Sequence, residues 1–102
     1  RLVSHVKHLL GGIDKPTLIM HPRFDDQSDL SNAFKLQREL SGMVETVVLD
    51  DCYHMITLDR QRHVVVDRSL DFVDRLVAAE QARARVVRPL ADRQLAASRA
   101  AE

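Results

Sequence analysis

Apolar residues at the start of the chain recur with a helical spacing. Their positions approach the i, i+3, i+4, i+7 pattern and predict a short amphipathic helix over residues 2–10. The apolar members are Leu2, Val3, Val6, Leu9 and Leu10. Gly11-Gly12 follows, and glycine commonly ends a helix. Pro16 then precedes the unbroken apolar run 18–20, which is typical of a strand buried on both faces of a parallel sheet.

A second helix and a second strand follow a polar loop. The loop, rich in Asp and Ser, runs from His21 to Leu30. We predict a helix over about 32–41 with Ser31 as its N-cap, because serine is a favoured capping residue. The expected apolar face of this helix is formed by Ala33, Leu36 and Leu40. The β-branched segment 44–49 predicts a strand, so residues 17–49 form a strand-helix-strand unit with parallel strands.

The last part of the chain predicts a long helix. A second loop covers residues 50–59, and the helix is expected from about Gln61 to Arg85. Its expected buried stripe is formed by Val66, Leu70, Val73 and Val77. Pro89 predicts a break, because proline removes a helical hydrogen bond. For the Ala- and Arg-rich tail, 86–102, we expect a loosely held helix or a frayed end.

Composition narrows the classes of partner. The 102 residues are 45% hydrophobic, with Lys+Arg and Asp+Glu balanced at 15 each, so the charge predicts neither nucleic acid nor an anionic membrane as partner. No apolar run reaches the length of a transmembrane helix. The one cysteine, Cys52, forms no disulfide within the chain and fits a reducing compartment, so we expect a cytoplasmic protein. The chain begins at Arg1, and we expect a segment to precede it.

Two polar loops leave the carboxyl ends of the predicted parallel strands. Such ends share one edge of the sheet, where α/β proteins bind ligands. The first loop carries Asp25 and Asp26, and the second carries His54. A carboxylate that accepts a hydrogen bond from histidine Nδ1 prepares Nε2 to act as a base. Spacing alone leaves both aspartates open as the carboxylate.

Both loops resemble a known family. Segment 15–26, K-P-T-L-I-M-H-P-R-F-D-D, is similar to the strand and acid loop of bacterial carboxylesterases and monoacylglycerol-lipase-like α/β-hydrolases. Segment 49–59, which contains H-M-I-T-L-D, resembles the histidine loop of this family, and residues 66–73 resemble its closing helix. The resemblance implies that Asp25 is the acid and His54 the base of a Ser-His-Asp triad.

The resemblance also implies a fold and a reaction. Residues 1–85 would be the C-terminal portion of an α/β-hydrolase domain, followed by the tail at 86–102. A G-x-S-x-G elbow is absent, so the serine nucleophile would lie upstream of Arg1. The parent protein would hydrolyse small carboxylic esters, such as short- to medium-chain acyl esters or monoacylglycerols, without a metal or other cofactor. The isolated chain would be inactive and unstable.

Other functions remain open from the sequence. An acyltransferase or thioesterase on the same fold would use the same two residues. A relative without a catalytic serine would be a binding or scaffold protein, and a doubly wound domain without a triad is a weaker alternative.

The cysteine, three other histidines and three loop aspartates could also take part in chemistry or shape the site. Cys52 is expected to be a buried structural thiol and not a nucleophile. His5 and His8 are expected on a solvated helix face, because no carboxylate or cysteine accompanies them as a metal ligand. His21 is expected to pack near the site without a catalytic role. Side-chain-to-backbone bonds that shape the histidine loop are expected from Asp50, Asp51 and Asp59.

Overall fold

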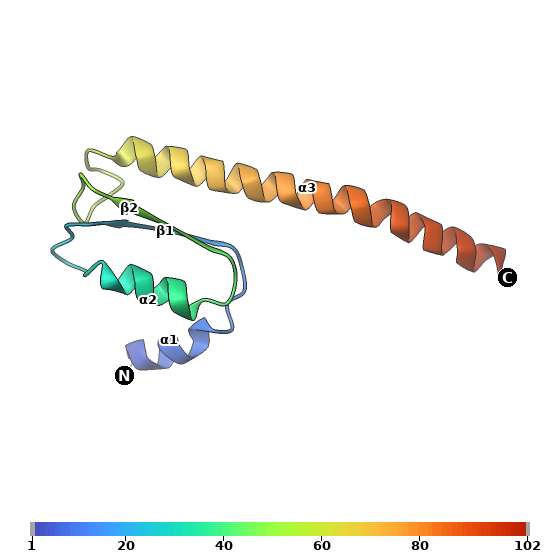
Figure 1. Ribbon diagram of the computed structural model, residues 1–102, viewed down its shortest axis with the longest axis horizontal. Helices are drawn as coiled ribbons and strands as arrows, with labels where there is room; N and C mark the ends of the chain where they lie inside the picture. Colours follow the sequence, from blue (N-terminus) through green and yellow to red (C-terminus); the bar gives the residue numbers. More distant parts are fainter. Residues whose placement is uncertain (1, 102) are drawn as a thin grey trace. The chain divides into compact units, whose positions relative to one another are not determined.

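The computed structural model describes residues 2–101 and shows the predicted order of helix, strand, helix, strand and long helix (Figure 1). The elements are α1 (Leu2–Leu10), β1 (Thr17–Pro22), α2 (Ser31–Glu39), β2 (Val44–Leu49) and α3 (Arg62–Ala100). The chain divides into two compact units, the first ending at Ser69 and the second beginning at Leu70. The first unit contains both strands and both polar loops, so all of the candidate chemistry lies within it.

Strands β1 and β2 pair in parallel, as predicted, with Thr17 opposite Val44 and Pro22 opposite Leu49. β1 is longer than predicted, because His21 and Pro22 continue the strand. The backbone N–H groups of Thr17 and Arg23 donate toward the β2 side, to the carbonyls of Met43 and Leu49. Backbone N–H groups alternate in direction along a strand, so the position of Pro22 would point its N–H away from β2. The missing N–H of Pro22 therefore does not interrupt this pairing.

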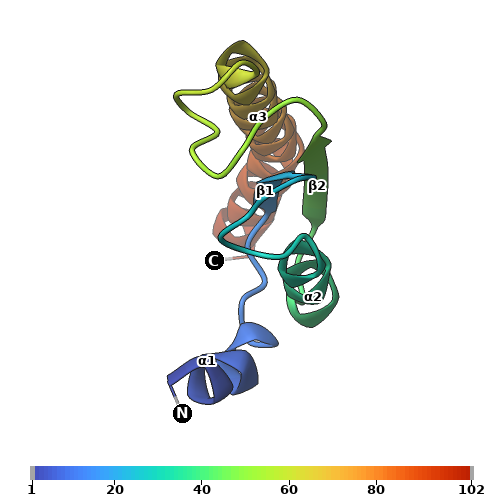
Figure 2. The ribbon, with the colours of Figure 1, turned by 90° about the vertical axis from the view of Figure 1, so that its left-hand side faces the viewer.

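The two faces of the sheet have different neighbours within the first unit, and α2 lies beside both strands (Figure 2). On one face, Met20 and Val47 pack against a buried cluster of Leu49, Cys52 and Val65, the last from the first turns of α3. Thr46 lies on the other face, where its hydroxyl donates to a side-chain oxygen of α2, 2.8 Å away. Since side chains alternate along a strand, each polar loop leaves a sheet that is held from both sides.

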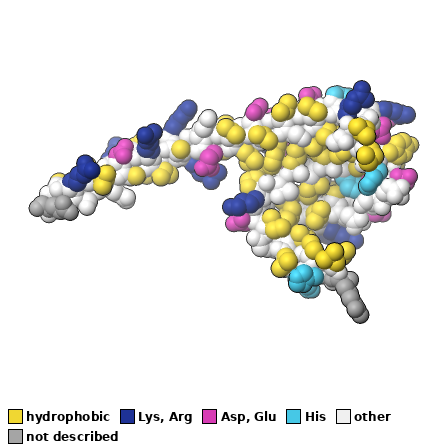
Figure 3. Space-filling model, turned by 180° about the vertical axis from the view of Figure 1, so that it is seen from behind, with side chains coloured by type: hydrophobic (Ala, Val, Ile, Leu, Met, Phe, Trp, Pro, Cys, Tyr) yellow, Lys and Arg dark blue, Asp and Glu magenta, His cyan; other side chains and the backbone are white. Residues whose placement is uncertain are grey.

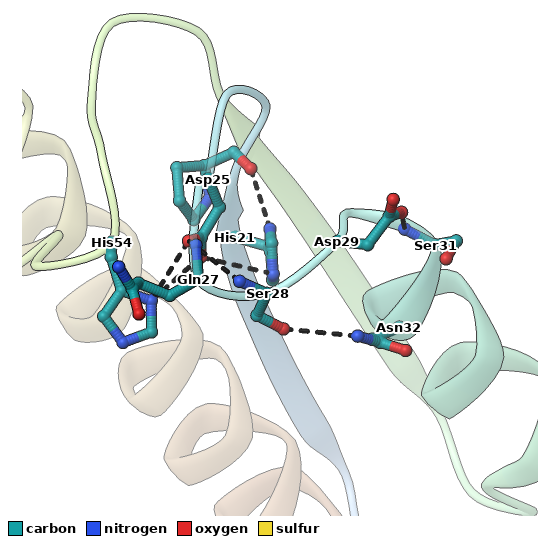
Figure 4. Close-up of polar contacts among 9 residues, drawn as sticks. His21, Asp25, Gln27, Ser28, Asp29, Ser31, Asn32 and His54 are labelled. Atoms are coloured by element: carbon teal, nitrogen blue, oxygen red, sulfur yellow. Dashed lines mark hydrogen bonds and ion pairs between the residues drawn. The ribbon is translucent and has the colours of Figure 1, made fainter.

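Helix α2 begins differently from the prediction. Ser31 is already helical, and the preceding residue makes no side-chain capping bond. The capping oxygen comes from Asp29, which accepts the N–H of Ser31 at 2.7 Å (Figure 4). This bond lowers the pKa of Asp29, since it stabilises the carboxylate. The Ser31 N-cap prediction is therefore wrong, because the helix begins one residue earlier than the serine pattern suggested.

The buried positions of α3 are shifted by one residue from the predicted stripe. Val66 and Leu70 are 55% and 60% exposed, and Val73 and Val77 are also exposed. The buried residues are Val65, in the first unit, and Phe72, in the second. Two adjacent lines of α3 are both apolar, so periodicity alone could not distinguish the buried line from its neighbour.

Pro89 does not break the long helix. It lies inside α3, which continues to Ala100. The missing proline N–H leaves one carbonyl of the preceding turn without its helical partner, and residues 82–100 are exposed to solvent. Water can therefore satisfy this carbonyl, and the predicted break was wrong.

The first unit leaves much apolar surface uncovered. Hydrophobic side chains spread over much of the face seen in Figure 3. α1 contains no buried residue, and together with α2 it lines an apolar hollow of about 600 Å³. None of the helices in the described range 2–101 is both long and apolar enough to span a membrane.

Candidate functional site

The carboxyl ends of β1 and β2 bring Asp25 and His54 into contact (Figure 4). Nδ1 of His54 lies 3.0 Å from Oδ2 and 3.2 Å from Oδ1 of Asp25, although the residues are 29 positions apart. The register explains this proximity: Pro22 and Leu49 are paired at the end of the ladder, and each is followed by one of the two loops. The parallel-strand argument thus correctly predicted that the two side chains would meet.

Asp25 is enclosed by hydrogen-bond donors. Its side chain is 2% exposed, and Oδ1 accepts the backbone N–H groups of Gln27 at 2.8 Å and Ser28 at 3.1 Å. Burial by itself raises the pKa of this carboxyl. The hydrogen bonds from His54, Gln27 and Ser28 outweigh burial, so the net pKa of Asp25 is lowered. The residue is therefore an anion near neutral pH.

This anion determines the proton arrangement on His54. A carboxylate can only accept hydrogen bonds, so the nitrogen facing it, Nδ1, must carry the proton. In the neutral ring, Nε2 then has a free lone pair. Nε2 makes no hydrogen bond to any residue between positions 2 and 101, and the side chain is 49% exposed. A neutral His54 can therefore accept a proton from a group that approaches through solvent.

His21 lies behind the pair, as expected. Its Nε2 is 3.7 Å from Oδ2 of Asp25, and its side chain is 14% exposed. Its Nδ1 is 2.7 Å from the carbonyl oxygen of Pro22, to which it can donate. His21 therefore packs against the Asp25 carboxylate from β1 and is mostly buried.

Asp26, the alternative acid, lies on the rim of the site. It makes no hydrogen bond or ion pair within the described part of the chain, whereas Asp25 bonds to His54. An open hollow of about 360 Å³ adjoins His54. It is lined by Asp26, Gln27, Tyr53, His54, Met55, Leu58 and Asp59. The geometry therefore selects Asp25 as the partner of His54 and leaves Asp26 facing the hollow.

The histidine loop is shaped only in part as expected. Asp59 bonds to backbone N–H groups, but Asp50 and Asp51 do not. Their carboxylates accept from the guanidinium groups of Arg23 and Arg60 instead. The N–H of Asp51 is taken by the side chain of Gln61, 2.8 Å away. The sequence carried no signal for this role of Gln61, because a glutamine at a helix start has many other uses.

Cys52 is buried, as predicted, at 3% exposed, and it packs with Leu49 and Val65. Among residues 2–101, the thiol has one polar partner, the Gln61 side-chain oxygen at 3.8 Å, and makes no hydrogen bond to His54. No group of three or more metal-ligating side chains occurs among residues 2–101, and His5 and His8 lie on α1. The chemically organised groups in this part of the chain are thus the Asp25–His54 pair and its supports.

No protein-family model matches the sequence, and no match was found among curated proteins.

Proposed function

We propose that this chain supplies the acid and the base of a serine hydrolase that acts on carboxylic esters. The observation that carries the proposal is the buried, ionised Asp25 bonded to Nδ1 of His54, with Nε2 directed away from it. This is the arrangement in which a carboxylate orients an imidazole and stabilises the imidazolium that forms during nucleophilic attack.

In the proposed reaction a serine outside these 102 residues attacks the acyl carbonyl. His54 Nε2 takes the serine proton and then passes it to the leaving alcohol. It next removes a proton from water, the hydroxide equivalent attacks the acyl carbonyl, and the acid leaves as His54 returns this proton to the serine oxygen. Asp25 remains ionised throughout and keeps the ring oriented. No metal or organic cofactor is required for these steps.

The exposed apolar surface of the first unit is an argument for a larger parent domain. A two-stranded sheet is marginal alone, and parallel sheets normally have both faces covered. Here the helices leave many apolar side chains exposed. Leu2, Val3 and Leu9 of α1 are more than half exposed. We therefore propose that the chain is the C-terminal part of an α/β-hydrolase domain, in which further strands and helices cover these faces.

The apolar part of the hollow suits an ester with a small uncharged alkyl or glyceryl portion. Tyr53, Met55 and Leu58 present apolar surface beside His54. Small-molecule acyl esters, including monoacylglycerols, are thus the proposed substrate class.

Turnover of a chromogenic short-chain ester by the complete polypeptide that carries this chain tests the proposal. His54→Ala should lower kcat by about four to six orders of magnitude, because it removes the general base. His63→Ala is the matched control: this histidine lies exposed on α3 and should leave the rate unchanged. Wild-type turnover in His54→Ala would refute the proposed chemistry.

A further inference from the structure

The carboxylate of Asp59 holds the backbone on both sides of the histidine loop. Its Oδ2 accepts the N–H of Tyr53 at 2.7 Å, and its Oδ1 accepts the N–H of Arg60 at 2.7 Å. Tyr53 immediately precedes His54. One side chain therefore links the residue before the proposed base to the residue that leads into α3.

The segment between these two points is compact. The N–H groups of Leu58 and Asp59 both donate to the carbonyl of Met55, at 2.9 and 3.2 Å. The N–H of Ile56 donates to the carbonyl of His54 at 3.1 Å. Since these turns are closed at one end by Asp59, a change at Asp59 alters the backbone from which the His54 ring projects.

The two bonds require an acceptor on each oxygen of Asp59. The N–H of Tyr53, and next that of Arg60, lower the pKa of Asp59, so this residue is a carboxylate near neutral pH. An amide at this position keeps one acceptor oxygen and can still accept the N–H of Tyr53, whereas alanine removes both acceptors.

A second side chain, that of Gln61, accepts a backbone hydrogen bond at the start of the histidine loop. Oε1 of Gln61 accepts the N–H of Asp51 at 2.8 Å. Asp51 itself bonds to Arg60 through its exposed carboxylate and does not touch the backbone before His54. Gln61 therefore anchors the loop where it leaves β2, whereas Asp59 acts at the residue next to the ring.

We propose that Asp59 is a positioning residue that keeps Nδ1 of His54 directed at Asp25. The inference rests on the proposed function and deepens it, because it names the group that maintains the tautomer a general base needs. Asp59 acts through the Tyr53 N–H and does not contact the ring.

Ring ¹⁵N chemical shifts of His54 in the complete polypeptide that carries this chain, measured in alkaline buffer where imidazoles are neutral, report which nitrogen carries the proton. We expect the wild type to show mainly the Nδ1–H form. In Asp59→Ala the share of this form should fall roughly twofold or more, since the Tyr53 N–H loses its acceptor and the backbone next to the ring is no longer held. Asp51→Ala removes the same charge from the same loop and should retain the wild-type spectrum.

Each outcome bears on a different claim. A wild-type ring without a predominant Nδ1–H form would overturn both the pairing with Asp25 and the present inference. A wild-type ring as expected with an unchanged Asp59→Ala spectrum would overturn only the role of Asp59. Equal loss in Asp59→Ala and Asp51→Ala would also overturn it, because loop charge would then be the cause.

The wild type provides a second measurement in case Asp59→Ala does not fold. The Tyr53 amide proton signal should shift on acidification together with protonation of the Asp59 carboxyl. A Tyr53 signal that does not follow this titration would overturn the inference.

Discussion

His54 Nδ1 lies 3.0 Å from Oδ2 of Asp25, and this contact joins two loops that leave neighbouring parallel strands. The carboxylate is almost fully buried, whereas the ring is about half exposed. The pair therefore combines an anion shielded from water with an imidazole that an external group can reach. This asymmetry is what a general base oriented by a carboxylate requires.

Substitution of each aspartate by asparagine distinguishes the role of Asp25 from that of Asp26. In the proposed parent hydrolase, Asp25→Asn should lower kcat for the proposed ester hydrolysis by about three to four orders of magnitude, because an amide no longer enforces the Nδ1–H tautomer of His54. Asp26→Asn should change kcat little, since its carboxylate makes no contact with the ring. Steady-state kinetics on both variants check this, and a larger loss in Asp26→Asn would make Asp26 the acid.

Acid should destabilise the chain partly through Asp25. Its folded-state pKa lies below the ordinary 3.8, so the unfolded state binds a proton more readily. The resulting stabilisation is fully present above 3.8 and is lost as the pH falls from there through the lowered value. The free energy of unfolding, measured in urea, should fall more over this pH window for the wild type than for Asp25→Asn. Asp26→Asn should follow the wild type, and identical acid dependence in Asp25→Asn would contradict the assignment.

Gly42 is required by a close approach of two loops. A Cβ there would lie 2.5 Å from the carbonyl carbon of Asp14 and 2.9 Å from the carbonyl oxygen of Lys15, both backbone atoms. Gly42→Ala should therefore destabilise the first unit by about 1–3 kcal/mol, the usual effect of overpacking. The control, Gly11→Ala, places its Cβ 4.0 Å from the nearest backbone oxygen, that of Glu39. It should change the unfolding free energy by less than about 0.5 kcal/mol in urea titrations, and equal effects of both changes would remove this reason for the glycine.

The order of elements and the meeting of Asp25 with His54 could be predicted from the sequence. Apolar periodicity distinguished helices from strands, and parallel strands place their following loops at one edge. The choice of Asp25 over Asp26 was not available from spacing, because adjacent residues in a loop can point either way. The family resemblance and the contact geometry select the same residue.

Several features depended on the tertiary structure alone. The buried line of α3 includes Val65, because the strand end at Leu49 packs there and not against the equally apolar Val66. The start of α2 is determined by the Asp29 carboxylate, and the histidine loop by Asp59 and Gln61. These outcomes depend on where backbone N–H groups point once distant segments meet.

The sequence by itself therefore determined the element types, their order and the edge of the sheet at which an acid and a histidine gather. Local periodicity and strand direction are sufficient for this. Only the tertiary structure decided which carboxylate oxygens accept which N–H groups, and hence how the His54 ring is aimed. Hydrogen bonds select partners by distances of a few tenths of an ångström, which residue spacing does not specify.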